Sequence, residues 1–207
     1  MSTSYYIDLG FDVNAAPISN NNSMVEFTAN GEVLYPLQLA LVDHTHGDVP
    51  AWFTHFVYKE RGTQDKLRFR IFDISSGINP TSSPGAASGW TPTDITVFSI
   101  MPDGGASAWP FSSANGGSVL QSYPSALSYG PTSLGTPSQV TSPVYGSQQS
   151  CWYIGQSSSN HEGLYFRFDT DGQFELSLSL TVQSPDGTEQ RLFMADPRMY
   201  VGPNSWP

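Results

Sequence analysis

The sequence FELSLSLTVQ, residues 174–183, decides the fold because hydrophobic and polar residues alternate along its whole length. Successive side chains of a strand point to opposite faces of a sheet. The pattern therefore predicts a strand with one buried and one solvent-facing side. Asp171-Gly172 precedes this strand and Asp186-Gly187 follows it, and Asp-Gly is a strong signal for a hairpin turn. We expect an antiparallel meander of three strands over 164–169, 174–183 and 190–196.

The same period of two recurs in the rest of the chain. In YYIDLGFDV (5–13), the residues Ile7, Leu9, Phe11 and Val13 share one face. Further strands are expected in WFTHFVYKE (52–60), KLRFRIFDI (66–74) and DITVFSIM (94–101). About eight such strands and no convincing helix predict an all-β protein of one domain, residues 1–207. The expected architecture is a single antiparallel β-sandwich, jelly-roll-like or immunoglobulin-like.

The overall charge excludes some partners. Only 13% of the residues are charged, against about 25% in an ordinary globular domain, and the formal net charge is −10. A negative field repels phosphate, so we expect neither nucleic-acid binding nor adhesion to an anionic membrane. A chain with few charges has little charge to desolvate in a protein contact, and β-sandwiches commonly form closed oligomers. A homo-oligomer is therefore expected.

Residues 102–150 have a different composition, rich in Gly, Ser and Pro. They are poor in charge, which is not the usual composition of disordered segments. We expect a long loop insertion here, either ordered around aromatic anchors or partly disordered between them, and such loops are often functional. The candidate anchors are Trp109, Phe111, Tyr123, Tyr129 and Tyr145.

The chain has one cysteine, Cys151, so no intramolecular disulfide is expected. It lies in the strand-like sequence CWYIG, where packing in the core is a simpler explanation than catalysis. The opening MSTSYYIDLGF lacks the features of a signal peptide, and no apolar run approaches the ~18 residues that span a bilayer. These features predict a cytoplasmic protein, with export by a route without a cleaved signal left open.

The sequence HTHGD contains the clearest candidate metal ligands. Two histidines at i and i+2 of a strand lie on one face about 7 Å apart, a usable spacing for zinc, copper or iron. The candidate ligands are His44, His46 and Asp48. The alternative is a polar corner in which both rings bond to the backbone, and we prefer it because the Glu expected after the second His of a cupin-like site is absent. We therefore expect no cofactor.

Calcium and sugars are the other candidate ligands. The sequence FDTDGQFE (168–175) offers carboxylates at Asp169 and Asp171, although the further ligands of a calcium loop are absent and a hairpin explains Asp-Gly. Aromatic side chains in Gly-rich surroundings can stack on sugars or make protein contacts, although each can equally anchor a loop in the core. The candidate ligand-binding aromatics are Trp90, Trp109, Tyr123 and Tyr129.

Two arginines alternate with hydrophobic residues in LRFRI (67–71). Arg68 and Arg70 therefore project from one face of the expected strand. They are expected to pair with acidic residues on a neighbouring strand. A protein interface or a contact with an anionic ligand is the functional alternative.

Several of these segments together resemble the AidA/PixA inclusion-body protein family. GTQDKLRFRIFDISSG (62–77) and DITVFSIMP (94–102) are similar to the family's centre, and FELSLSLTVQSPDGTEQRLFMADPRMYVG (174–202) is similar to its ending. YYIDLGFDVN (5–14) is similar to its first strand, with the acidic residue at Asp8 or Asp12. The resemblance implies a β-sandwich made in the bacterial cytoplasm and associated with dense inclusions, and it brings no catalytic motif.

The leading functional hypothesis is therefore a non-enzymatic bacterial inclusion-body-type protein that acts by self-assembly or binding. The first alternative is a lectin-like carbohydrate-binding protein, with exposed Trp or Tyr near Asp or Asn and with calcium as a conceivable cofactor. The second alternative is a metal-dependent jelly-roll enzyme that uses His44 and His46.

Overall fold

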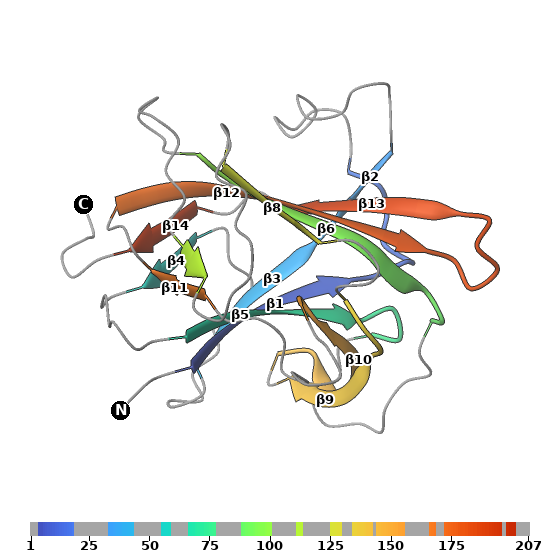
Figure 1. Cartoon of the computed structure of the whole chain (residues 1–207). Coiled ribbons are helices and arrows are strands. Elements are labelled where there is room, and N and C mark those ends of the chain that lie inside the picture. Colours follow the sequence, from blue (N-terminus) through green and yellow to red (C-terminus); the bar gives the residue numbers. More distant parts are fainter. Residues whose placement is uncertain are drawn as a thin grey trace.

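The part of the chain that the computed structural model describes is built from strands, without a helix (Figure 1). It comprises residues 4–18, 33–43, 55–58, 66–77, 88–100, 111–113, 125–129, 134–142, 144–155, 166–168, 172–195 and 198–201. Over these ranges, no helix is long and apolar enough to cross a membrane. The strands are β1 (Ser4–Phe11), β2 (Leu34–Pro36), β3 (Gln38–Asp43), β4 (His55–Tyr58), β5 (Lys66–Asp73), β6 (Thr91–Ile100), β7 (Phe111–Ser113), β8 (Ser125–Tyr129), β9 (Ser138–Ser142), β10 (Gly146–Tyr153), β11 (Phe166–Phe168), β12 (Gly172–Gln183), β13 (Gln190–Ala195) and β14 (Arg198–Val201).

The strands form two sheets of seven, which confirms the predicted all-β sandwich-like fold. Sheet A has the order β3-β1-β5-β10-β9, with β11 beside β5 and β7 beside β11. Sheet B has the order β2-β13-β12-β14-β4, with β6 on the other side of β12 and β8 beside β6. Figure 1 shows β6, β12 and β13 above β1, β3 and β5.

Both sheets are mixed, which corrects the expectation of purely antiparallel sheets. β1 runs parallel to β5, β2 to β13 and β4 to β14. Between β1 and β5 the chain contributes β2 and β4 to sheet B. A strand that returns to its sheet after such an excursion can run in the same direction as the strand that left it. The local sequence contains no signal that distinguishes a parallel from an antiparallel partner.

β12 is the central strand of sheet B. Leu178, Leu180 and Val182 are fully buried on one face, as the alternation predicts. β12 pairs with β13 through the predicted hairpin, in which Gly187 has a φ of +73°. The Asp186 carboxylate accepts hydrogen bonds from the hydroxyls of Ser184 and Thr188 and from the Thr188 N–H, which lower its pKa to about 2.

The predicted hairpin between the segments 164–169 and 174–183 is wrong. β11 pairs with β5 and β7 in sheet A, and not with β12 in sheet B. The prediction of a strand at 164–169 is confirmed by β11. Its partners could not be predicted, because strand pairing depends on contacts between distant parts of the chain. The position beside β12 is taken by β6, which pairs with it along almost its whole length.

The main core lies between the two sheets. Ile7, Leu9 and Phe11 of β1 are buried there, and Val13 packs against its margin, so the predicted shared face is confirmed. The other members come mainly from β3, β5, β6, β10, β12 and β13. The Phe11 ring contacts the rings of Trp152 and Phe193, with centroids 6.1 and 5.9 Å apart.

A second, smaller core lies on the opposite face of sheet A. It consists of Phe72, Ile74, Tyr145 and Cys151, and the hairpin of β9 and β10 supplies the last two (Figure 1). β7, β8, β9 and the first part of β10 fall within 102–150, so the described parts of this region differ from the expected loop and pair in the sheets. Of the predicted anchors, Tyr145 is confirmed as buried, with 1% of its surface exposed.

Gly10 allows this second core to close over sheet A. A Cβ at Gly10 would lie 2.9 Å from both Ile74 Cδ1 and Tyr145 Cζ. These distances are shorter than carbon atoms tolerate, so Tyr145 can lie across β1 only where β1 has no side chain.

We expect Gly10→Ala to lower the free energy of unfolding by about 1–3 kcal/mol, the usual cost of overpacking a well-filled core. Urea denaturation followed by tryptophan fluorescence measures this change. Gly10→Ala combined with Tyr145→Leu, which removes part of the opposing ring, is expected to lose less stability than the two single variants summed. Strict additivity would contradict the contact.

Candidate functional site

A buried ion pair lies on the face of sheet A that the β9–β10 hairpin covers. Arg70 Nε donates to Asp8 Oδ1 at 2.6 Å and Arg70 Nη2 donates to Asp8 Oδ2 at 2.7 Å. Asp8 is fully buried and Arg70 is 5% exposed. The two residues are direct neighbours in the parallel register of β1 and β5. This confirms, for Arg70, the predicted pairing with an acidic residue on a neighbouring strand; Arg68 is buried on the same strand.

Polar and aromatic side chains surround the Asp8–Arg70 pair. Ser142 Oγ donates to Asp8 Oδ2 at 3.0 Å, and the Arg70 guanidinium lies 4.1 Å from the ring centroid of Tyr6. The Tyr145 hydroxyl lies 3.2 Å from the carbonyl oxygen of Asp8 and 3.1 Å from that of Gln38. Burial raises the pKa of Tyr145 well above its usual range, so this hydroxyl keeps its proton and remains a donor.

Cys151 belongs to the second core, beside Tyr145, and is fully buried. This confirms the prediction that it packs in the core. Burial raises the pKa of its thiol far above the usual range, and Asp8 adds to the effect while Arg70 opposes it. The thiolate is the reactive form of cysteine. This thiol is therefore held in its unreactive form.

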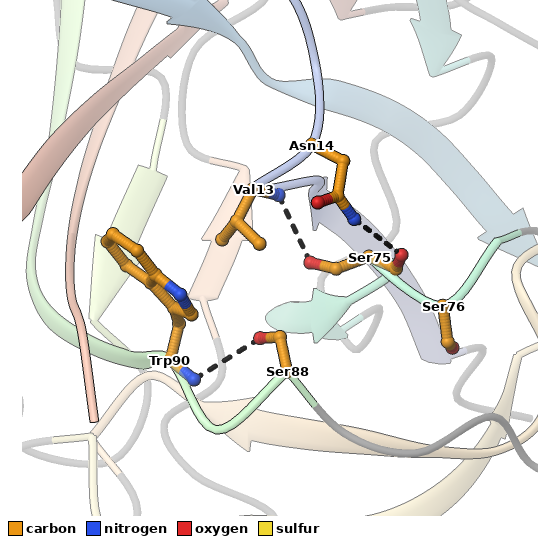
Figure 2. A pocket seen from close by; sticks show the side chains of 6 residues that line it. All are labelled: Val13, Asn14, Ser75, Ser76, Ser88 and Trp90. Atoms are coloured by element: carbon orange, nitrogen blue, oxygen red, sulfur yellow. Dashed lines mark hydrogen bonds between the residues drawn. The ribbon is translucent and has the colours of Figure 1, made fainter.

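A polar hollow of about 330 Å³ lies where three connections meet (Figure 2). Val13 and Asn14 follow β1, Ser75 and Ser76 follow β5, and Ser88 and Trp90 precede β6. These six residues line it. Except for Val13 and Trp90 they are neutral and polar, and none of the six carries a charge.

Asp73, at the end of β5, holds two walls of the hollow together. Its Oδ1 accepts from the Ser75 N–H (3.1 Å) and hydroxyl (2.6 Å), and its Oδ2 accepts from the Ser88 N–H (2.8 Å) and hydroxyl (2.6 Å). Asp73 is only 3% exposed. Its four hydrogen bonds hold Ser75 and Ser88 together, although these residues are 13 positions apart in the chain. The Asp73 carboxylate therefore has a structural role.

The remaining walls are fixed in the same way. The Val13 N–H donates to Ser75 Oγ at 3.1 Å, and the Asn14 side-chain amide donates to the Ser75 carbonyl oxygen at 3.0 Å. The backbone N–H of Trp90 donates to Ser88 Oγ at 3.2 Å. Arg191 lies over the Trp90 ring, 4.8 Å from its centroid, and donates to the Val13 carbonyl oxygen. The hollow is therefore already shaped without a ligand.

The structure describes only part of the predicted site. Trp90 lines the hollow and packs partly against the main core, and Tyr129 ends β8. The sequence did not predict four residues that line the hollow, because a serine in a chain so rich in serine gives no distinctive signal. They are Asn14, Ser75, Ser76 and Ser88. The other predicted residues lie outside the described ranges: Trp109, Tyr123, Asp169, Asp171, His44, His46 and Asp48.

The calcium and transition-metal predictions therefore stay predictions. Within the described ranges no three His, Cys, Asp or Glu side chains are grouped so that they could hold a metal ion. The histidines and aspartates proposed as ligands fall outside those ranges.

We expect Asp8→Ala to destabilise the protein by about 3–5 kcal/mol, because it leaves the Arg70 guanidinium buried without its carboxylate. Glu189→Ala is the control, since it breaks the Arg191–Glu189 pair, where Glu189 is 50% exposed, and such exposed pairs contribute at most about 1 kcal/mol. Urea denaturation measures both. Equal losses from the two variants would contradict a structural role for the buried pair; Asp8→Asn is the substitute if Asp8→Ala does not fold.

We expect Cys151 in the native protein to react with a thiol-reactive disulfide reagent at neutral pH at least about a hundredfold more slowly than in the urea-unfolded chain. The burial of the thiol and its raised pKa both act in this direction. Absorbance of the released thiol measures the two rates on the same sample. Similar rates in both states would show that the thiol is accessible.

Comparisons with known proteins yield one likeness. No family model matches the chain, and no curated protein matches it. The chain is similar to the crystal structure of an inclusion body protein, PixA, from Burkholderia cenocepacia, with 12% sequence identity and a TM-score of 0.34. The likeness covers 97% of this chain and 96% of that one. That solved structure is of the family that the sequence motifs resemble.

Proposed function

We propose that this chain is a non-enzymatic bacterial protein of the inclusion-body type, located in the cytoplasm, that acts by assembling with copies of itself. The assembly contact is the pairing of strands at those edges of the two sheets where the described residues supply no further strand. The observation that carries the proposal is the absence of lysine and arginine from the edge strands of the described sheets.

Six strands pair on one side only within the described part of the protein. Strands at the edge of a sheet carry unpaired N–H and C=O groups, and proteins commonly protect them with charged side chains, lysine above all. Here none of the six contains lysine or arginine, and Asp43 is their only acidic residue. The edge strands are LYP of β2, QLALVD of β3, HFVY of β4, FSS of β7, SALSY of β8 and SQVTS of β9.

The long-range charge of the chain modulates such an assembly. Each copy carries a formal net charge of −10, so copies repel one another at low ionic strength. Salt shortens the range of this repulsion to about 8 Å at physiological ionic strength. The hydrogen bonds between edges are short-range and are not screened in this way, so assembly should increase with added salt.

The surroundings of the buried ionisable groups in the described part of the protein support binding in preference to turnover. Catalytic acids, bases and nucleophiles need an accessible site and a suitable pKa. Asp8, Arg70 and Asp73 are instead buried in internal contacts, and the Cys151 thiol is held protonated.

We expect Thr141→Lys to weaken self-association by at least about tenfold, because edge pairing between copies brings like charges together. Thr141 is exposed on β9 and its substitution leaves the cores intact. The control is Gln190→Lys, which adds the same charge at an exposed position of β13, an inner strand of sheet B. Size-exclusion chromatography with light scattering, over a range of protein and salt concentrations, gives the association constants.

Two results would overturn the proposal. One is a parent protein that stays monomeric at all protein and salt concentrations. The other is an association that both lysine variants weaken equally, since this would point to net charge and not to the edge. If only Thr141→Lys weakens association, the β9 edge is the contact.

A further inference from the structure

We infer that the hollow formed by Val13, Asn14, Ser75, Ser76, Ser88 and Trp90 is a binding site for a neutral sugar ring. This inference is independent of the proposed self-assembly, because the hollow lies between connections and not along a free edge. It depends on three features of the hollow: its preformed walls, its unused hydrogen-bonding groups and its lack of charge.

The walls keep their shape without a ligand. Asp73 accepts four hydrogen bonds from Ser75 and Ser88, and Ser75 in turn binds the chain at Val13 and Asn14. Each connection is therefore fixed to another one. A ligand that enters such a site does not have to order the surrounding loops, so a small molecule can bind there with few contacts.

Three polar groups of the hollow are left without a partner in the described structure. They are the indole N–H of Trp90, the hydroxyl of Ser76 and the side-chain carbonyl oxygen of Asn14. Figure 2 shows the Trp90 indole and the Asn14 amide at opposite sides of the hollow, with Ser75 and Ser88 between them. Together the free groups offer one donor, one acceptor and one hydroxyl that can do both.

The lining selects against charged ligands. None of the six side chains is charged, the nearby Asp73 carboxylate is buried and occupied by its four hydrogen bonds, and the Arg191 guanidinium beside Trp90 is paired with Glu189. The net charge of −10 repels anions at long range. A cation would meet no available carboxylate among the lining residues. The favoured ligand is therefore a neutral one.

Trp90 narrows the ligand class further. The Arg191 guanidinium packs over its ring, the Ser88 hydroxyl holds its backbone N–H, and the nitrogen edge of the indole faces the hollow in Figure 2. A rigid aromatic group with a polar handle binds a molecule that offers both C–H surface and hydroxyl groups. A sugar ring has this combination. The hollow, at about 330 Å³, lies at the small end of ligand sites, which range over about 300–1,000 Å³, so it fits one ring better than a long chain.

The test uses isothermal titration calorimetry on the whole protein. The probes are the methyl glycosides of glucose, galactose, mannose and N-acetylglucosamine, each titrated with calcium and again with a chelator. We expect saturable binding of at least one glycoside, equal under both conditions. Ser76→Ala and Trp90→Phe each remove one of the free polar groups, and each should weaken binding roughly three- to tenfold.

Thr141→Ala is the matched control for Ser76→Ala, since it removes an exposed hydroxyl from β9, which does not line the hollow. It should leave binding unchanged. The inference is overturned if no glycoside binds saturably, if binding survives both hollow variants unaltered, or if the chelator abolishes binding, because the last result would place the sugar at a metal-dependent site elsewhere. Light scattering of the same samples reports self-assembly separately, so either proposal can fail alone.

Discussion

The buried pair of Asp8 and Arg70 is the constraint on which the other features of this protein depend. Two oppositely charged groups without water must stay in contact, since separating them leaves a buried charge uncompensated. Because the residues are direct neighbours in β1 and β5, their contact fixes the register of this parallel pair. A slip of β1 by one residue would turn Asp8 toward the main core and leave Arg70 buried without its carboxylate. Ser142 and Tyr145 then attach the β9–β10 hairpin to the same point.

The position of the hollow follows from that register. β1 and β5 are parallel, so the connections after Phe11 and Asp73 leave sheet A at the same end, where the Ile74 N–H donates to the Phe11 carbonyl oxygen at 3.0 Å. Asp73 is then placed to bind Ser75 and Ser88, and Ser75 to bind Val13. The ion pair inside the sheet thus helps to determine where three loops meet, because Phe11 and Asp73 lie three residues beyond Asp8 and Arg70 on the same two strands.

A shortage of charged side chains connects the two proposals. Among the charged residues of the described sheets, Asp8, Arg70 and Asp73 are used in buried contacts. Apart from Asp43, the edge strands of the described sheets contain no acidic residue and no lysine or arginine, and the lining of the hollow is neutral. Neutral edges favour pairing between copies, and a neutral hollow favours a neutral ligand. The acidic excess of the whole chain acts at longer range, where it limits association and repels anions.

The sequence alone determined the strands with clear alternation and their buried faces, because the alternation of side chains is a property of each strand, but it predicted a loop where β7, β8 and β9 lie. It predicted the buried face of β12, the β12–β13 turn at Asp186-Gly187 and an acidic partner for Arg70. The sheet that β11 joins, the parallel direction of β1 and β5, and the four serine and asparagine residues of the hollow were decided by the tertiary structure. Strand partners depend on contacts between residues far apart in the chain, and a serine acquires its role only when the fold brings it to Asp73.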